Sequence, residues 1–522
     1  MRTSNRIVSL AMSASVVRAL ILLVALFCPG LALAPQTQTG QQRALRLNHF
    51  PFSRQTQADA SGFYSMPTAI GEDYFDGTSP LARVRRHLAV ARRAGVKFLR
   101  CGFSWNAIEK EPGRYDWKFW DALVALAAQK GIELTPYVAY PPKWAVRDAK
   151  DFWKQPPRDP ALYADFMQKA VTRYRGRIRT WEIWNEPDNK DYWTSSAEEF
   201  ARLVKTTAPR IREADPNAVI VLGGMAYGPG EFFRELMTRH HISRYVDVIA
   251  LHGYPESWLE ARAETMFHDW IPAMQQMIVT DGSGADLWLN EMGYADYRFR
   301  ANQASLYGTS VLYRHEHTRE YQAAMLFKFE VMALASQGVS LTGWYRIDDF
   351  PRSEKRLGRD LVNYHLGVVD DRQRPKPAFF ALRSFNRLFG RPTRRVTLNV
   401  ARGPKSQSVV EALQRKDGSF VVVGWLRSSL PQELAINTGN LPDRRSENVS
   451  IQAPCAAART VGFYDALGRR LKLAARMRAG RMENITLHGD RVLVAELSCG
   501  INSNAPRQPH LRGARGTAGS SD

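Results

Sequence analysis

Short apolar runs alternate with longer segments of helical periodicity from about residue 61 to about residue 390. Such runs are typical of buried strands, and such periodicity is typical of helices packed against them. The apolar runs predict strands at 66–71, 96–103, 132–140, 178–186, 218–223, 246–252, 287–291 and 339–345. Helices are predicted at 81–94, 115–130, 160–175, 197–214 and 320–336. Eight strands alternating with helices predict a (β/α)8 barrel, or TIM barrel, of the α/β class.

An open, doubly wound sheet is the alternative to a barrel, because it shows the same alternation of strands and helices. That fold usually carries a glycine-rich phosphate-binding turn after its first strand. No such turn follows residues 66–71. We therefore favour the barrel and place it at residues 61–390.

The pattern changes after a predicted helix at 378–388. The runs that follow are short and β-branched, and Gly, Asp, Asn and Pro separate them, at 396–400, 408–413, 420–425, 433–436, 449–451, 460–464 and 492–497. They predict a small antiparallel β-sandwich at residues 391–500. This domain either binds glycan or braces the barrel, and we expect bracing. Residues 501–522 are rich in Gly, Ser, Arg and Pro and are predicted to be disordered.

The N-terminus has the layout of a secretory signal peptide. Arginines at positions 2, 6 and 18 precede the apolar run 19–27, and Ala32-Leu33-Ala34 supplies a small-x-small cleavage pattern. We expect a signal peptide at 1–34, a polar linker or arm at 35–60, and export to the periplasm or the medium. An uncleaved membrane anchor is the alternative. No later stretch is apolar enough to cross a bilayer, so no stable membrane span is expected after cleavage.

Two glutamates each follow an asparagine at the end of a predicted strand. Glu186 lies in Trp184-Asn185-Glu186-Pro187, where Pro187 cannot continue the ladder, and Glu291 lies in Leu289-Asn290-Glu291. In a barrel the carboxyl ends of all strands open onto one face. Two carboxylates that converge there can cleave an acetal, one as a proton donor and the other as a nucleophile or base. The chemistry expected at this face is therefore glycosidic bond hydrolysis.

Other side chains at predicted strand ends fit a sugar site. Arg100 can hold Glu291 ionised, Asn185 can bond a sugar hydroxyl, and Tyr254 can donate to the nucleophile. His252 is expected to have a supporting role, since a lone histidine is more often structural than catalytic. Trp344, at the end of a predicted strand, is a candidate platform for a sugar ring, with a buried core position as its ordinary alternative. Further candidate platforms on predicted loops at the same face are Trp105, Trp144 and Trp193.

These motifs resemble the clan A glycoside hydrolases, and three further runs are most similar to family 39. The runs are 103–109 (Phe-Ser-Trp-Asn-Ala-Ile-Glu), 346–348 (Arg-Ile-Asp) and 366–370 (Leu-Gly-Val-Val-Asp). The resemblance covers about residues 61–390 and implies a retaining mechanism. It implies that Glu186 is the acid/base and Glu291 the nucleophile, with substrate contacts from Arg100, Asn185, His252, Tyr254 and Trp344. In place of a histidine that clan members often carry at the end of strand three, this chain has Tyr137 and Tyr140.

Charge and cysteine content add little to this picture. The net charge of +21 can attract acidic polysaccharide or reflect a general arginine bias, and the absence of a nucleic-acid-binding motif argues against nucleic acid. Cys455 and Cys499 can pair in an oxidising compartment, whereas Cys101 falls inside a predicted strand and is expected to be a buried hydrophobe. No Cys/His spacing indicates a metal site, and no cofactor is expected.

The sequence therefore predicts an exported retaining glycoside hydrolase that cleaves β-glycosidic bonds, with a bacterial exopolysaccharide as the expected substrate. A non-catalytic carbohydrate-binding or polysaccharide-assembly protein on the same barrel is the alternative. Transglycosylation would use the same residues. The sequence does not indicate the identity of the sugar, the linkage, endo or exo action, or the oligomeric state.

Overall fold

The computed structural model describes residues 61–74, 76–255, 262–296, 318–351, 362–428 and 443–499. All of them belong to one structural unit, residues 39–522. The signal peptide, the arm and the tail predicted from the sequence lie outside the described residues, as does the strand predicted at 433–436. No helix among the described residues has the length and apolarity needed to cross a membrane.

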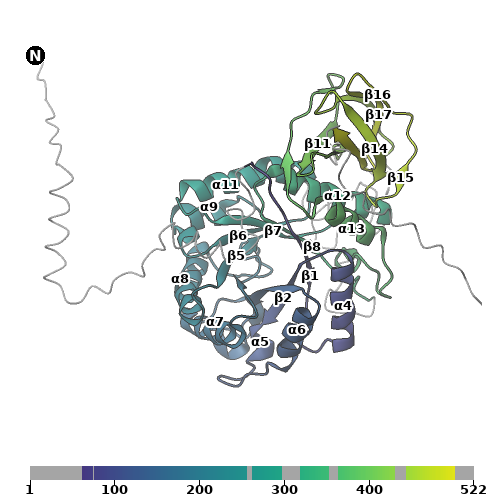
Figure 1. The fold of residues 1–522 in the computed structure, drawn as a ribbon. Helices are drawn as coiled ribbons and strands as arrows, with labels where there is room; N and C mark the ends of the chain where they lie inside the picture. The colour runs from purple at the N-terminus through teal and green to yellow at the C-terminus, as the bar shows by residue number, and fades with distance from the viewer. Residues whose placement is uncertain are drawn as a thin grey trace, which may run out of the picture. The chain divides into compact units, whose positions relative to one another are not determined.

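Eight parallel strands close into a barrel in chain order (Figure 1). Closure is made by β1 against β8, with Ala69 opposite Gly343. This confirms the predicted TIM barrel. The strands are β1 (Thr68–Glu72), β2 (Phe98–Ser104), β3 (Glu133–Ala139), β4 (Thr180–Ile183), β5 (Val219–Met225), β6 (Val248–Gly253), β7 (Asp286–Met292) and β8 (Leu341–Tyr345).

Helices pack around the outside of the barrel (Figure 1). Several begin at a side chain that caps the first turn: Asp159 accepts from the Ala161 amide, and Ser196 accepts from that of Glu199. The shorter helices at residues 105–108, 231–238, 263–265 and 271–280 were not predicted. The α-helices are α4 (Leu81–Arg93), α5 (Trp105–Ile108), α6 (Lys118–Gln129), α7 (Pro160–Tyr174), α8 (Ala197–Ala214), α9 (Glu231–Thr238), α10 (Ala263–Thr265), α11 (Ile271–Thr280), α12 (Arg319–Ser336) and α13 (Pro377–Phe389).

Two antiparallel sheets follow the barrel, which confirms the predicted sandwich. Their orders are β10-β13-β17-β16 and β15-β14-β18-β12-β11-β9. A separate apolar core that includes Val422, Ile485 and Leu497 lies between them. The strands are β9 (Thr393–Arg395), β10 (Val400–Ala401), β11 (Ser408–Arg415), β12 (Phe420–Leu426), β13 (Ser446–Gln452), β14 (Ala458–Asp465), β15 (Arg470–Leu471), β16 (Arg476–Arg478), β17 (Arg481–His488) and β18 (Leu493–Cys499).

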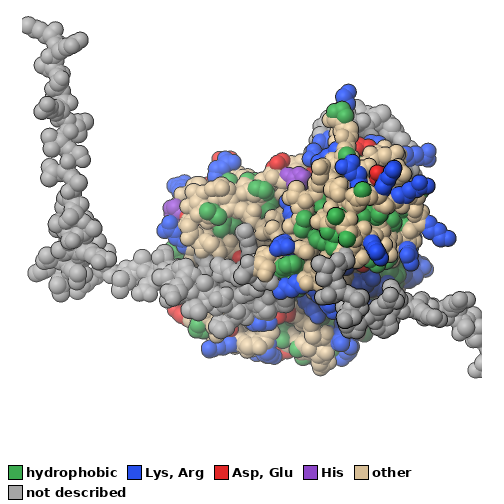
Figure 2. All heavy atoms as spheres, turned by 45° about the horizontal axis from the view of Figure 1, so that its top comes forward, with side chains coloured by type: hydrophobic (Ala, Val, Ile, Leu, Met, Phe, Trp, Pro, Cys, Tyr) green, Lys and Arg blue, Asp and Glu red, His purple; other side chains and the backbone are tan. Residues whose placement is uncertain are grey.

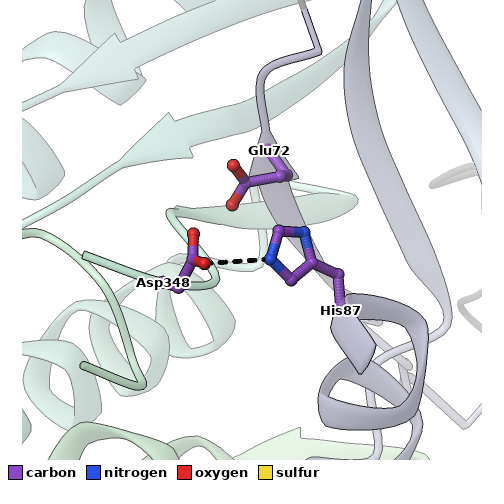
Figure 3. Close-up of side chains that lie close together, drawn as sticks. All are labelled: Glu72, His87 and Asp348. Atoms are coloured by element: carbon purple, nitrogen blue, oxygen red, sulfur yellow. Dashed lines mark hydrogen bonds and ion pairs between the residues drawn. The ribbon is translucent and has the colours of Figure 1, made fainter. Parts of the chain in front are cut away.

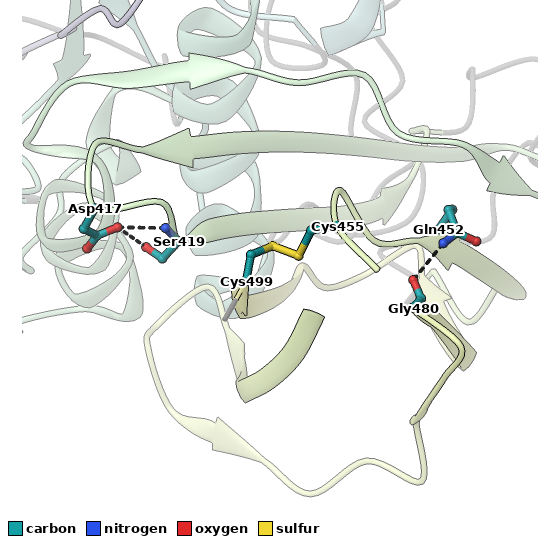
Figure 4. The surroundings of a disulfide bond; sticks show 6 residues. All are labelled: Asp417, Ser419, Gln452, Cys455, Gly480 and Cys499. Atoms are coloured by element: carbon teal, nitrogen blue, oxygen red, sulfur yellow. Dashed lines mark hydrogen bonds between the residues drawn. A yellow bond between two sulfur atoms is a disulfide. The ribbon is translucent and has the colours of Figure 1, made fainter. Parts of the chain in front are cut away.

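Cys455 and Cys499 form a disulfide across 44 residues of chain, as Figure 4 shows. The bond ties the end of β18 to the turn that precedes β14. The predicted pairing is therefore present in the structure. Cys101 is free and buried, and burial raises the pKa of its thiol, so it behaves as the small core residue that the sequence predicts.

The sandwich contacts the barrel through apolar and polar groups. Valines and a tryptophan of the sandwich join the main barrel core, and Trp425 donates its indole N–H to Glu264 at 3.4 Å. Lys328 of α12 donates to the Gly489 carbonyl at 3.2 Å. Side chains are buried continuously along α12, from Tyr321 to Ala335. These contacts agree with a bracing role for the sandwich.

One buried carboxyl of α12 is expected to make stability depend on pH. Glu330 accepts a hydrogen bond from Thr342 at 2.6 Å, and burial raises its pKa from 4.5 to about 8. Between those pH values the folded state binds a proton that the unfolded state does not. The free energy of unfolding therefore falls as pH rises from about 4.5 to about 8. Glu330→Gln removes this penalty. We expect equal urea midpoints for both proteins near pH 4.5, and a variant more stable by on the order of several kcal/mol at pH 8. A constant difference at both pH values would contradict the assignment.

Candidate active site

Glu186 and Glu291 meet at the carboxyl-terminal mouth of the barrel. Each offers a carboxylate oxygen, and these oxygens and a ring nitrogen of His252 all lie within 4.8 Å of one another. Nδ1 of His252 is 2.8 Å from Glu186 Oε1 and 3.8 Å from Glu291 Oε1. The structure thus brings together the two glutamates that the sequence singles out, with the imidazole between them.

The chain turns sharply where it delivers Glu186. The sequence predicts that strand four runs to residue 186, but β4 ends at Ile183. Trp184 and Glu186 have φ values of 72° and 46°, in the left-handed region. This turn ends the extended strand early and carries Asn185 and Glu186 over the mouth of the barrel.

Arg100 and Tyr254 both donate hydrogen bonds to Glu291, as the sequence predicts. Arg100 Nη1 lies 2.5 Å from Oε2, and the Tyr254 hydroxyl lies 2.7 Å from Oε1. Burial alone would raise the pKa of Glu291, but nearby His252 and Arg100 and the Tyr254 hydrogen bond lower it below 4.5. Glu291 is therefore held as a carboxylate.

Arg100 is itself fixed by a residue that sequence reasoning missed. Nε and Nη2 of Arg100 each lie 2.8 Å from an oxygen of Glu182, a buried side chain of β4. Asn290 also donates to Glu182 at 2.9 Å, and Arg100 Nη2 donates to Asn185 at 2.8 Å. The signal was available: an acidic residue within an apolar strand requires a buried cation, and Arg100 is the matching charge on β2.

His252 fits into the site because residue 224 has no side chain. A Cβ added to Gly224 of β5 would lie 2.0 Å from Nε2 of the imidazole. The ring is 1% exposed. Burial lowers the pKa of His252, but Glu291 and Glu186 outweigh burial, so that the pKa is raised above 6.5. The His252 imidazole therefore holds its proton to higher pH than a free imidazole would.

Trp344 does not face the site, contrary to the prediction. It is fully buried, 6.2 Å from the Phe329 ring of α12, and its indole N–H donates to the Leu366 carbonyl at 3.3 Å. Side chains alternate between the two faces of a strand, so the next residue, Tyr345, points to the mouth. Its hydroxyl donates to Asp73 at 2.7 Å.

Two of the other predicted platforms are also core residues. Trp105 is fully buried against Phe166 and donates to Glu109 at 2.7 Å, and Trp193 is fully buried at 4.9 Å from the Trp184 ring. Neither presents a face to a ligand, so the predicted platform role is wrong for both. Trp144 is partly buried against the barrel core, and its role as a platform stays a prediction.

Asp73 is a second acidic residue of the mouth that the sequence did not indicate. It follows β1 and accepts hydrogen bonds from Tyr137 and Tyr345, each at 2.7 Å. Burial raises its pKa, as does the charge of Glu291. The Tyr137 ring lies beneath the Arg100 guanidinium at 4.5 Å. The tyrosine that replaces the clan's usual histidine thus belongs to a hydroxyl–carboxylate cluster beside the nucleophile candidate.

Three groups of acidic and imidazole side chains among the described residues are close enough to hold a metal ion. Figure 3 shows one of them, in which His87 bonds Asp348 next to Glu72. Arg346 bonds Glu72, and Arg83 bonds Asp348 at 2.9 Å. Each of the other two groups likewise contains a carboxylate bound by Arg100 or Lys376. A cationic side chain already binds a carboxylate of each group, which favours ion-pair networks over metal centres.

Comparison with known families decides the relationship. The model of the glycosyl hydrolases family 39 matches residues 118–423, more than half of the chain. The chain belongs to glycosyl hydrolase family 39. The matched region contains both glutamates of the mouth, His252 and Tyr254. A model described as β-galactosidase also matches residues 73–159 of this family 39 chain.

Related sequences are similar to the family 39 chain over short segments only. A β-galactosidase from Thermus sp is 37% identical over 81 residues, which is 15% of this chain and 12% of the relative. A β-xylosidase from Caldicellulosiruptor saccharolyticus is 31% identical over 101 residues, which is 18% of this chain and 20% of the relative. The chain thus spans at most a fifth of the length of these two relatives.

Solved structures share the fold of the family 39 chain over most of its length. A family 39 glycoside hydrolase from Bacteroides cellulosilyticus WH2 superposes with a TM-score of 0.61 at 14% identity, covering 83% of this chain and 80% of that one. The family 39 enzyme from Xanthomonas axonopodis pv. citri gives 0.58 at 16% identity, covering 85% and 96%. The family 39 chain therefore shares the fold of both structures over more than four fifths of its length.

Proposed function

We propose that this family 39 protein is a retaining β-glycosidase in which Glu291 is the nucleophile and Glu186 the acid/base. The observation that carries the proposal is the separation of the two carboxylates, whose closest oxygens lie within 4.8 Å. Retaining glycosidases hold their carboxyl groups about 5–5.5 Å apart, and inverting enzymes about 6.5–9.5 Å apart to admit a water. The observed separation favours direct attack on the sugar.

The first step forms a bond between Glu291 and the anomeric carbon. As that bond forms, the carbon–oxygen bond to the leaving group breaks, and the leaving oxygen takes a proton from Glu186. Glu186, now charged, then removes a proton from water. The water oxygen attacks the anomeric carbon and releases Glu291 as a carboxylate. Two inversions give net retention, and both glutamates return to their starting states.

The electrostatic environment supports this division of roles. Arg100 and Tyr254 both bind Glu291, and its lowered pKa favours the charged form that a nucleophile needs. Glu186 instead lies beside His252, whose raised pKa keeps a proton on the imidazole, with Nδ1 2.8 Å from Glu186 Oε1. Asn185 is held by Arg100 beside the mouth, where its amide can bond a sugar hydroxyl.

The proposed substrate is a β-linked exopolysaccharide outside the cytoplasm. Three observations support this part: the signal-like N-terminal sequence, the Cys455–Cys499 disulfide, which is typical of oxidising compartments, and the β-galactosidase and β-xylosidase relatives. Lys and Arg side chains stand at many places around the face shown in Figure 2, with fewer Asp and Glu between them. This spread supports a general attraction to acidic polymers better than one dedicated binding patch.

The test is covalent trapping. Purified protein is incubated with activated 2-fluoro β-xylosides and β-galactosides, and peptide mass spectrometry locates the label. We expect the mass of one fluorosugar on the peptide that contains Glu291, and NMR of a normal substrate should detect the β-anomer of the product first. Label on another residue, or the α-anomer first, would overturn the retaining mechanism. A panel of bacterial polysaccharides then identifies the polymer.

The pH dependence of kcat/KM follows from the two perturbed groups. Glu291 must be charged, and its lowered pKa places the acid limb below pH 4.5. The imidazole beside Glu186 must hold its proton, and the raised pKa of His252 places the alkaline limb above pH 6.5. We expect His252→Asn to move the alkaline limb to lower pH and, because His252 also lowers the pKa of Glu291, to move the acid limb to higher pH. An alkaline limb that does not move in that variant would mean that the His252 imidazole does not set it.

A further inference from the structure

Two aromatic side chains are exposed beside Glu186. Among the large hydrophobic side chains of the described residues, Trp153 is 37% exposed and Tyr227 is 50% exposed, and no other aromatic one is exposed to this degree. Trp153 lies in the connection between β3 and β4, and Tyr227 in the turn after β5. Because β3, β4 and β5 are neighbours in the barrel, these residues stand on either side of the β4 end that carries Glu186.

Trp153 is held in place by two tyrosines next to the acid/base. Its ring centroid lies 5.9 Å from that of Tyr140 at an interplanar angle of 71°, and 6.1 Å from that of Tyr192 at 76°. The Tyr192 amide donates to the carbonyl of Asn189, whose side chain donates to Glu186 at 3.0 Å, so Tyr192 lies near that carboxylate. Burial raises the pKa of each tyrosine hydroxyl. The Thr194 amide also donates to the Lys154 carbonyl at 3.0 Å. Trp153 is therefore an exposed ring on a fixed support.

Tyr227 is fixed through Asp188. The backbone amides of Ala226 and Tyr227 each donate to the Asp188 carboxylate at 2.9 Å. Burial raises the pKa of Asp188 to about 6. The pKa of the Tyr227 hydroxyl is raised by burial and then by the charge of Glu186. The turn that carries Tyr227 is thus bonded to the segment that follows Glu186.

The position of these two rings indicates which part of a substrate they would contact. In the proposed mechanism Glu186 protonates the leaving oxygen, so whatever lies beyond that oxygen passes over the ends of β3, β4 and β5. Flat aromatic faces bind the apolar faces of sugar rings through buried carbon–hydrogen surface. Isolated exposed aromatics need no explanation, but here both flank one carboxylate and both are anchored.

We propose that Trp153 and Tyr227 form a binding site for the sugar unit on the leaving-group side of the cleaved bond. The inference rests on the proposed function, because it takes Glu186 as the acid. It implies that the natural leaving group is itself a sugar. The substrate is then an oligosaccharide or polysaccharide rather than the glycoside of a small alcohol. The same site then accepts a sugar in place of water when the glycosyl–Glu291 ester is resolved by transfer.

The kinetic test compares two substrates that share the reacting sugar. One is a β-glycosyl fluoride, whose leaving group is a single atom, and the other is the matching β-linked disaccharide. For Trp153→Ala and Tyr227→Ala we expect kcat/KM on the disaccharide to fall about 10- to 100-fold. The fall in kcat/KM on the glycosyl fluoride should be at least about tenfold smaller than that on the disaccharide. Val279→Ala, at a 68% exposed position of α11, is the control and should change neither. Equal losses on both substrates would overturn the site.

A binding measurement separates this inference from the proposed function. Calorimetry with Glu186→Gln, with and without Trp153→Ala, uses β-1,4-xylotriose and β-1,4-galactotriose, with xylose and galactose as short controls. We expect Trp153→Ala to raise the dissociation constant of at least one trisaccharide about tenfold or more. The dissociation constant of the matching monosaccharide should change much less. Unchanged trisaccharide binding would overturn the aromatic site even if the wild type hydrolyses glycosides. If Trp153→Ala weakens trisaccharide binding but the wild type hydrolyses no glycoside, the aromatic site is supported and the proposed hydrolysis is rejected.

Discussion

Glu291→Gln is expected to lower kcat on aryl β-glycosides by about 10⁴-fold or more. The amide has no charge with which to attack the anomeric carbon, so no glycosyl–enzyme ester forms. The fold should persist, because the amide oxygen of glutamine can still accept a hydrogen bond from Arg100 or Tyr254. Sugar binding should therefore survive while turnover is lost. The measurements are kcat with an aryl glycoside and the melting temperature.

The structure offers a matched control for this substitution. Glu330→Gln makes the same chemical change at a buried position of the same barrel, on α12 behind β8 rather than at the mouth. It should leave kcat within about twofold of the wild type while altering stability at pH 8, as argued above. Near-normal hydrolysis by Glu291→Gln, or an equal loss in both variants, would reject the role of Glu291.

Glu186→Ala should produce a loss that depends on the leaving group. Proton donation contributes about 10²–10⁴-fold, and it matters most when the departing oxygen is strongly basic, as in a sugar. We expect a large fall in kcat/KM for a disaccharide. The fall should be small for a dinitrophenyl glycoside, whose leaving group needs no proton. The second step also loses its base, so the glycosyl–Glu291 ester should accumulate.

Added azide tests the same variant directly. An azide ion needs no general base, so it can attack the anomeric carbon of the accumulated ester and release the Glu291 carboxylate. The expected product is a β-glycosyl azide, with recovery of turnover on the dinitrophenyl glycoside. The Glu291→Gln variant forms no ester and should not respond. An α-glycosyl azide from Glu186→Ala would mean that azide attacks the substrate itself and that the two roles are assigned the wrong way round.

The barrel and its two glutamates could be predicted because they leave simple marks in the sequence. Each apolar strand that ends in Asn-Glu places a carboxylate at a known edge of a parallel barrel, whatever the exact register. Arg100 and Tyr254 followed from the same reasoning, and the structure places both on Glu291. The short strands after residue 390 predicted the sandwich because their alternation differs from that of the barrel strands.

Predictions were wrong where a shift of one residue along a strand reverses the direction in which a side chain points. Trp344 and Tyr345 are adjacent on β8, and alternation sends one to the helices and the other to the mouth. Trp105 and Trp193 fill the core, which the type of residue alone does not reveal. Asp73 follows β1 and so had the same strand-end position as the two glutamates, but its contacts with Tyr137 and Tyr345 join segments that are distant in the chain. Such contacts depend on tertiary structure and have no local signature.

The fit between Gly224 and His252 affects how homologous sequences should be read. A chain that keeps Asn185, Glu186 and Glu291 but carries any side chain at position 224 would push the imidazole off the acid, since even a methyl group falls 2.0 Å from its ring. Such a homologue would satisfy every motif search and still show the pH profile expected of His252→Asn. The residue at position 224 of β5 therefore reports on a contact of the site that no acidic motif records.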